Sequence, residues 1–370
     1  MAKQLKAGLT VSPYLLWFLI HGTQTGVSTL NFQNRIIHDA EMDSWLSLLL
    51  VGVCCHLIAS MMFYILKHAE EGDLISLHRQ LFGVGVGWIM NFIIYAYILL
   101  FMMNEMMAYA EVLHVWVFLS SPMWMLLLIV LLPCIYIVSG GLRVITGICL
   151  LCVVLPSFLL LSLYYTVKQA HWTNLQPVFN HHGVEYVHSA FQSIPLFVGL
   201  QFLLFLYPFV KNNTKSQKWA HIAVFHSTFI YFIILIASFV YFNIEQLNHT
   251  VWPTLNLSKI IRFSFLERFE FVYIFEWYFV IMPPCCVALW SAVRVVKKTL
   301  AMKARPSLWL TCGLLFLCML IAQQFLTVDR IRNWLTWSGG IFMFGYIPLL
   351  FLWVAAARWL RRRIDKRVRV

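Results

Sequence analysis

The stretch WFLIHGTQTGVSTL, residues Trp17–Leu30, decides the fold, because it begins as an apolar helix and then loses that character. From His21-Gly22 onward it is rich in Gly, Thr, Ser and Gln, where the middle of a membrane span is expected. Lipid offers the backbone no hydrogen-bond partners, so non-helical chain survives at that depth only inside protein or beside a cavity. Transporter folds place small-solute sites at such broken helices, whose ends present free N–H and C=O groups. We therefore predict a solute site in this stretch.

The composition is that of a membrane protein. Of the 370 residues, 61% are hydrophobic and 11% are charged, and the mean hydropathy is +0.78, whereas soluble domains are about a quarter charged. The net charge of +12 does not indicate nucleic-acid binding, because the basic residues form short clusters between apolar runs. The lipid bilayer is the expected surrounding, and no nucleic-acid partner is expected.

The cysteines and histidines predict neither a metal site nor another cofactor. All nine cysteines lie within apolar runs, where thiols behave as small apolar groups, and the pair Cys149 and Cys152 is only a weak metal or redox signal. His181 and His182 precede Glu185 without a second ligand cluster at zinc spacing. We expect no catalytic residue, no metal and no cofactor.

Hydropathy predicts ten membrane spans, since a span needs about 20 mostly apolar residues. They are 9–30, which is broken, 44–66, 86–110, 122–139, 144–167, 188–209, 218–243, 270–293, 308–326 and 336–357. With the N-terminus inside, 20 of the 27 lysines and arginines fall in inner segments and 7 in outer ones. This asymmetry predicts that both termini are cytoplasmic.

The ten spans divide into two sets of five, 9–168 and 188–359, followed by a basic tail, 360–370, within one transmembrane domain. An odd number of spans per half inverts the second half relative to the first. The first span of the second half carries Gly199 and Gln201 near its middle, one turn after Pro195. Each half therefore begins with an interrupted span, which is the sequence pattern of a transporter-type site. A kink or a tight helix contact at Gly199 is the alternative.

Three segments resemble one known family. WPTLNLSKIIRFSFLERFEFVYIFEW, Trp252–Trp277, resembles the signature of the B subunits of bacterial spore germinant receptors, with its Trp-Pro pair, apolar helix and LERFE element. PLFVGLQFLLFLYPFV, Pro195–Val210, is similar to the sixth span of that family, and YAEVLHVWVFLSSP, Tyr109–Pro122, to the end of its third. The resemblance covers nearly the whole chain. One departure is Gln201, where family members often carry an acidic residue.

The resemblance implies a fold and a function. The family belongs to the amino acid–polyamine–organocation superfamily, so the expected fold is all-α, with two inverted five-helix repeats and broken first and sixth helices. The implied protein is a germinant receptor subunit, not an enzyme, that binds a small nutrient, foremost an amino acid, and triggers germination. The implied partners are an A subunit and a lipoprotein C subunit. The implied location is the spore inner membrane, with both termini on the core side.

The candidate site residues follow from the two interrupted spans. The predicted solute-binding residues are Gly22, Thr23, Gln24, Thr25, Gly26 and Ser28 in the first break, and Tyr97, Gly199 and Gln201 facing it across a cavity. The predicted gating or vestibule residues are Tyr95, Glu105 and Glu276. Each has a structural alternative: a helix-packing face for Gly22 and Gly26, an aromatic core position for Tyr97, and a solvated outer rim for Glu105.

Two other functions stay open. One is an ordinary amino acid or amine permease, although sodium-coupled relatives of this fold carry Ser or Thr on the eighth helix opposite the first break. Here that helix reads Pro283-Pro284-Cys285-Cys286, with no hydroxyl until Ser291, which favours a sensor over a driven transporter. The other is a membrane enzyme that uses His181 and His182.

Overall fold

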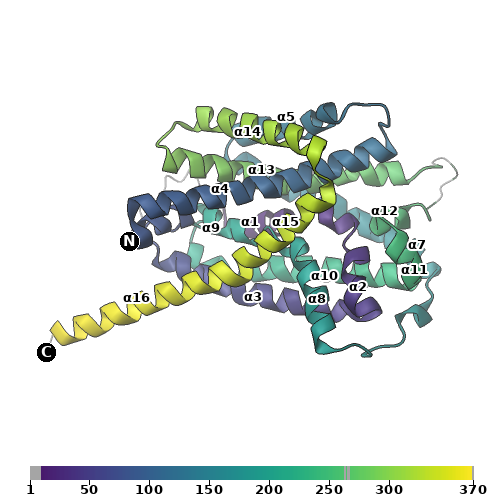
Figure 1. Cartoon of the computed structure of the whole chain (residues 1–370), viewed down its shortest axis with the longest axis horizontal. Coiled ribbons are helices and arrows are strands. Elements are labelled where there is room, and N and C mark those ends of the chain that lie inside the picture. The colour runs from purple at the N-terminus through teal and green to yellow at the C-terminus, as the bar shows by residue number, and fades with distance from the viewer. Residues whose placement is uncertain (1–9, 262–263, 265–266, 369–370) are drawn as a thin grey trace.

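The computed structural model describes residues 10–261, 264 and 267–368, and in them the regular structure is helical apart from one isolated parallel bridge between Val11 and Val210. Two long helices, α4 (Leu74–Trp116) and α13 (Glu270–Thr299), run side by side along the bundle (Figure 1). The last helix, α16 (Ile347–Val368), projects beyond the other helices (Figure 1). Long apolar runs take this form because helices satisfy their own backbone hydrogen bonds in lipid.

The first half of the chain contains two irregular spans. Its elements are α1 (Leu15–Gln24), η2 (Val27–Leu30), α2 (Gln33–Ala40), η3 (Glu41–Asp43), α3 (Ser44–His68), α4, α5 (Met123–Ser139), α6 (Leu142–Val154), η4 (Pro156–Ser162) and α7 (Leu163–Lys168). The fifth predicted span is interrupted where η4 begins, because Pro156 has no N–H group to continue the α-helical ladder.

The second half repeats the pattern of a broken first span. Its elements are η5 (Trp172–Leu175), α8 (Gly183–Phe197), η6 (Leu200–Phe202), α9 (Leu203–Leu206), η7 (Tyr207–Phe209), η8 (Asn213–Lys215), α10 (Gln217–Tyr241), α11 (Ile244–His249), α12 (Pro253–Ser258), α13, α14 (Ala304–Phe325), α15 (Val328–Gly340), the π-helical turn η9 (Ile341–Tyr346) and α16. The broken span bends by 48° between α8 and the segment Leu200–Phe209.

The chain is a multi-pass membrane protein. By length and composition, 7 helices can cross a membrane, and the bent pair at Gly199 raises the number to 8. The apolar helix α5 is shorter, with 17 residues, and α1 has 10. Together these elements correspond to all ten predicted spans. They are consistent with a count of ten membrane-spanning helices, which stays a prediction.

Several predicted boundaries were wrong. The first helix does not stop at His21-Gly22 but continues to Gln24, because Gly22 packs within the helix against Pro283. The third span is longer than predicted, since α4 has 43 residues and a kink at Gly83, where φ is +76°. The apolar helix that the resemblance implies after Trp252 begins as α12 (Pro253–Ser258), and residues 262–263 and 265–266 lie outside the described part of the chain.

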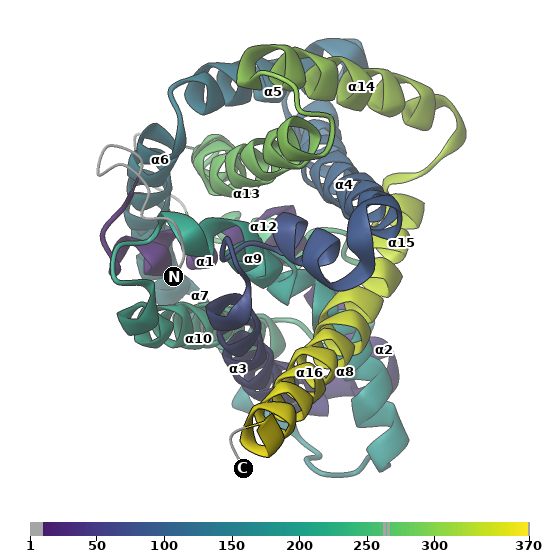
Figure 2. The ribbon, with the colours of Figure 1, turned by 90° about the vertical axis from the view of Figure 1, so that its left-hand side faces the viewer.

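Both ends of the described chain lie at the same end of the bundle. Figure 1 places them on the left-hand side, and Figure 2, which looks onto that side, shows both turned toward the viewer. The bridge between Val11 and Val210 belongs to this end, where the N–H of Val11 donates to Phe209 and that of Lys211 donates back to Val11, each at 2.9 Å. This pairing ties the start of the first span to the end of the sixth.

Candidate functional site

The first span is broken at Thr25 and Gly26. The N–H of Thr25 makes the last helical bond of α1, 2.9 Å from the carbonyl of His21, and then the backbone becomes extended. Gly26 has φ −145° and ψ −156°, and η2 begins at Val27. The break leaves the N–H groups at the start of η2 without helical acceptors.

Glu105 of α4 supplies the missing acceptor for one of these N–H groups. Its Oε2 accepts the N–H of Val27 at 2.8 Å, and its Oε1 accepts from the side-chain amide of Asn104 at 3.1 Å. A Cβ added at Gly26 would overlap Oε2 of Glu105, so the glycine is what lets the carboxylate approach the backbone. Glu105 is only 3% exposed. The alternative of a solvated rim position was therefore wrong.

Three buried polar atoms around the break have no hydrogen-bond partner among the described residues. They are Oγ of Ser28, Oγ1 of Thr29 and Oδ1 of Asn104. Buried polar atoms are nearly always hydrogen-bonded in folded proteins, and leaving one unpaired costs about 1–3 kcal/mol. The break can therefore form further hydrogen bonds to a polar ligand or water beside the Glu105 carboxylate.

The second break lies at Gly199, in the sixth span. Gly199 has φ +130°, which only glycine adopts readily. Its N–H donates to Oε1 of Gln201 at 2.8 Å, and the amide nitrogen of Gln201 donates to the hydroxyl of Tyr97 at 2.9 Å. Tyr97 also stacks on Phe342, with ring centroids 5.1 Å apart. Gln201 thus links the second break to the third and tenth spans.

The two breaks are in direct contact. Thr23 Oγ1 lies 3.2 Å from the carbonyl of Gly199 and shares its proton between this oxygen and the carbonyl of Ile20 at 2.9 Å. Gln24 Nε2 lies 3.5 Å from the carbonyl of Phe197. A Cβ added at Gly199 would overlap the carbonyl of Thr23 and lie 2.9 Å from the N of Gln24. Thr23 and Gln24 therefore join the two breaks and do not face Gly199 across a cavity.

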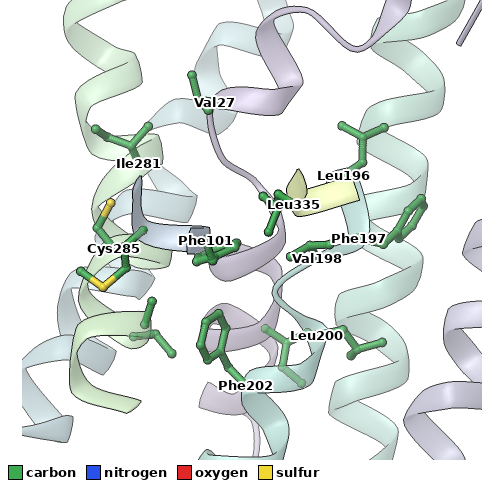
Figure 3. Close-up of a cluster of buried hydrophobic side chains, with 14 of the residues drawn as sticks. Val27, Phe101, Leu196, Phe197, Val198, Leu200, Phe202, Ile281, Cys285 and Leu335 are labelled. Atoms are coloured by element: carbon green, nitrogen blue, oxygen red, sulfur yellow. The ribbon is translucent and has the colours of Figure 1, made fainter. Parts of the chain in front are cut away.

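Apolar side chains enclose this contact. Figure 3 shows Val27, Phe101, Leu196, Phe197, Val198, Leu200, Phe202, Ile281, Cys285 and Leu335 gathered around the two broken segments. They come from the first and sixth spans and from α4, α13 and α15. In such surroundings each polar interaction is stronger than in water, and each unpaired polar group is more costly.

A cavity lies on another side of the first break. Its volume is about 70 Å³, and it lies between the first break, the fifth span, α10 and α13. The side chains of Thr25 and Thr29 line it together with His21, and Pro156 and Trp277 supply part of its apolar wall. A small solute with an apolar part and a few polar groups matches such a lining.

The remaining predicted residues lie away from the Glu105 carboxylate. Tyr95 points toward α14, where its hydroxyl donates to Thr311 Oγ1 at 3.3 Å. Glu276 is partly buried beside Trp277, on the side of Cys152. Of the three predicted gating residues, only Glu105 contacts the first break.

Two residues near the site were not predicted. Ser227 of α10 donates to Oε1 of Gln24 at 2.9 Å and lies 2.8 Å from Nδ1 of His21, so it anchors the last turn of α1. Arg332 of α15 is buried, and its guanidinium bonds Asp329 at 2.9 Å and, in the amide orientation that satisfies both groups, Asn31. Ser227 could have been found from the sequence as a serine within an apolar span. Arg332 could not, because it lies in a segment assigned to the outer face.

The sequence of this chain is similar to that of one known family. The family model described as "Spore germination protein" matches residues 10–326. The spore germination protein GerQB of Bacillus cereus is 32% identical over 97% of this chain and 100% of its own length. The spore germination protein B2 of Bacillus subtilis (strain 168) is 21% identical over 94% of this chain and 95% of its own.

Solved structures show the same fold. MHP1, a nucleobase-cation-symport-1 family transporter in a closed conformation, has a TM-score of 0.66 at 14% identity, over 98% of this chain and 81% of its own. MhsT in complex with L-phenylalanine has a TM-score of 0.62 at 14% identity, over 96% and 89%. The predicted helical fold of inverted repeats with broken first and sixth helices is thereby confirmed. With a family match over most of its length and a full-length relative at 32% identity, the chain belongs to the spore germination protein family.

Proposed function

We propose that this chain is the solute-binding subunit of a germinant receptor, and that it binds a small nutrient with an ammonium group, foremost an amino acid, at the first-helix break. The observation that carries the proposal is the buried carboxylate of Glu105 at Gly26 and Val27. A carboxylate held in apolar surroundings favours a cationic partner, because charge pairs are stronger where water is excluded.

The groups around Glu105 suit the two ends of an amino acid. Oδ1 of Asn104 is an unpartnered acceptor that can share the ammonium with Glu105. The hydroxyls of Ser28 and Thr29 are unpartnered, and Thr29 lines the adjacent cavity, so both hydroxyls are available to the ligand's carboxylate. The apolar wall of Pro156 and Trp277 is then available to its side chain.

A sensor is favoured over a driven transporter. Opposite the first span, Pro283 of α13 packs against Gly22, where an added Cβ would lie 2.9 Å from that of Pro283. Apolar contact therefore occupies the place where sodium-coupled relatives of this fold carry hydroxyl groups. Binding would instead shift the bundle between conformations with different affinities for the solute. An A subunit and a lipoprotein C subunit would bind the two conformations differently and so respond to that shift. The chain would lie in the spore inner membrane with both of its termini on the core side.

The test compares two Gly→Ala changes in spores. Gly26→Ala places a methyl group where Oε2 of Glu105 lies, whereas Gly147→Ala adds the same methyl group where nothing lies within 4 Å. Hydrogen bonds to charged groups contribute about 1.5–3 kcal/mol. We therefore expect Gly26→Ala to raise the half-maximal concentration of the effective amino acid about tenfold or more, and Gly147→Ala to leave it unchanged.

The measurement is germination of spores that lack this gene and carry the wild-type or variant chain, exposed to single amino acids. Immunoblotting of spore membranes checks that each variant accumulates. A normal dose–response from Gly26→Ala spores would overturn the placement of the site. Saturable uptake of a labelled amino acid by the purified chain in liposomes would instead support the permease alternative.

A further inference from the structure

A second groove lies far from the breaks, at the end of the bundle where the termini lie. It has a volume of about 960 Å³ and is formed by the turn between α5 and α6, the last turns of α13 and the first turn of α14. Four cationic side chains line it, from three separate elements: Arg143, Arg294, Lys297 and Arg305. No acidic residue is among the described residues that line it. The groove therefore concentrates positive charge.

The outer wall of the groove is apolar and exposed. Leu132 and Tyr136 of α5 are 56% and 81% exposed, and Trp309 of α14 is 57% exposed. Exposed apolar side chains continue away from the groove along α14, at Leu310 and Leu314. On a membrane-spanning helix, such side chains face lipid tails, and Trp and Tyr mark the level of the headgroups. The charges thus meet the apolar surface at headgroup depth.

The floor of the groove is rigid. The Arg294 guanidinium lies 4.3 Å from the ring centre of Phe209 and 5.1 Å from that of Trp290, and both rings also line the groove. Asp73 accepts a hydrogen bond from the other side of Arg294 at 2.9 Å. A guanidinium fixed in this way loses no further side-chain freedom when a ligand arrives. Because Asp73 balances the charge of Arg294, the net positive charge of the groove comes from Arg143, Lys297 and Arg305.

We propose that this groove binds the headgroup of an anionic phospholipid from the inner leaflet. The phosphate would lie among Arg143, Lys297 and Arg305 above Arg294, and the acyl chains would follow the exposed faces of α5 and α14. Basic pockets between membrane helices on the cytoplasmic side are suited to anionic headgroups. A soluble phosphate compound would use the charges but would leave the apolar wall uncovered.

The test measures lipid binding by the purified full-length chain in detergent. Phosphatidylglycerol and phosphatidylcholine are added separately, and bound lipid is counted by native mass spectrometry. Arg143→Gln, Lys297→Gln and Arg305→Gln are combined in one variant, which spares Arg294. The matched control combines Lys211→Gln, Lys215→Gln and Lys218→Gln, three exposed lysines at the same end of the bundle.

We expect the wild-type chain and the control to bind phosphatidylglycerol at least tenfold more tightly than phosphatidylcholine, and the groove variant to lose that preference. Equal loss in the control would overturn the proposal, because general surface charge would then explain the preference. Inorganic phosphate that binds the wild-type chain as tightly as the lipid would also overturn it. A groove variant that keeps its lipid preference would overturn it as well. If that variant also failed to copurify with the A subunit, the groove would be a protein-docking surface. Circular dichroism verifies that both variants remain folded.

Discussion

At the scale of single residues, Glu105 has two roles that substitution can separate. Its carboxylate accepts the N–H of Val27, which is a structural role, and it carries the charge proposed to hold a ligand's ammonium. Glu105→Gln keeps an oxygen acceptor and removes the charge. We expect this variant to unfold in detergent at nearly the wild-type temperature, while the half-maximal amino acid concentration for germination rises about tenfold or more.

Glu105→Ala is the companion change. It leaves the buried N–H of Val27 without an acceptor, which costs about 1–3 kcal/mol, so it should lower the unfolding temperature as well as the response. Normal germination of Glu105→Gln spores would show that the carboxylate does not hold the ligand.

The sequence identified Glu105 as a candidate but not its depth. A helix of 43 residues is much longer than one span, so hydropathy leaves its position along the membrane normal undetermined. The group that donates to Glu105, the N–H of Val27, is a backbone group far away in the chain and leaves no mark in the sequence. The need for glycine at position 26 likewise becomes clear only once the carboxylate beside it is known.

At the scale of elements, Tyr97 joins the third span to the break in the sixth. Tyr97→Phe would keep the stack on Phe342 but would remove the acceptor of the buried Gln201 amide. We expect the free energy of unfolding to fall by about 1–3 kcal/mol, because a buried donor is left unpaired. Chemical denaturation of the purified chain in detergent measures the change.

Tyr95 provides the matched control on the same helix. Its hydroxyl donates to Thr311, which itself donates to the carbonyl of Ser307 at 2.8 Å, so Tyr95→Phe leaves no buried donor unpaired. A loss in Tyr95→Phe as large as that in Tyr97→Phe would contradict the proposed link. Residues two apart on a helix do not share a face, so the sequence could already have separated Tyr95 from Tyr97.

The breaks themselves were predictable from composition, and their limits were not. Glycines with polar neighbours mark both interrupted spans, and their matching positions in the two halves predict a transporter-like fold. Packing decides which glycine interrupts its helix. Gly22 stays helical against Pro283, whereas Gly199 adopts φ +130° against the carbonyl of Thr23. These partners are distant in the sequence, so spacing alone does not reveal them.

At the scale of the whole molecule, hydropathy and charge asymmetry predicted a multi-pass helical bundle, but they did not reveal the buried ion pairs at the end near the termini. At the end near the termini, Asp73 is fully buried and bonds both Arg294 and Lys298. Burial alone would raise the pKa of the Asp73 carboxyl, but Lys298 and Arg294 lower it below its ordinary value. Its ion pairs therefore persist at neutral pH and are lost only as the pH falls through that lowered pKa.

Asp73→Asn tests whether these ion pairs hold this end closed. Asparagine is as good an N-cap as aspartate, so the cap on Ser76 is kept while the charge is removed. A cysteine at the buried Val11 reports opening through its rate of labelling by a membrane-impermeant maleimide in inside-out vesicles, relative to the chain without it. We expect labelling to accelerate about tenfold or more, because loss of one partner of a buried pair exceeds about 1.4 kcal/mol. Glu71→Gln removes only the exposed contact with Lys298 and should leave the rate unchanged. Equal rates in Asp73→Asn and wild-type chains would instead assign the closure to the backbone pairing of Val11 with Phe209 and Lys211.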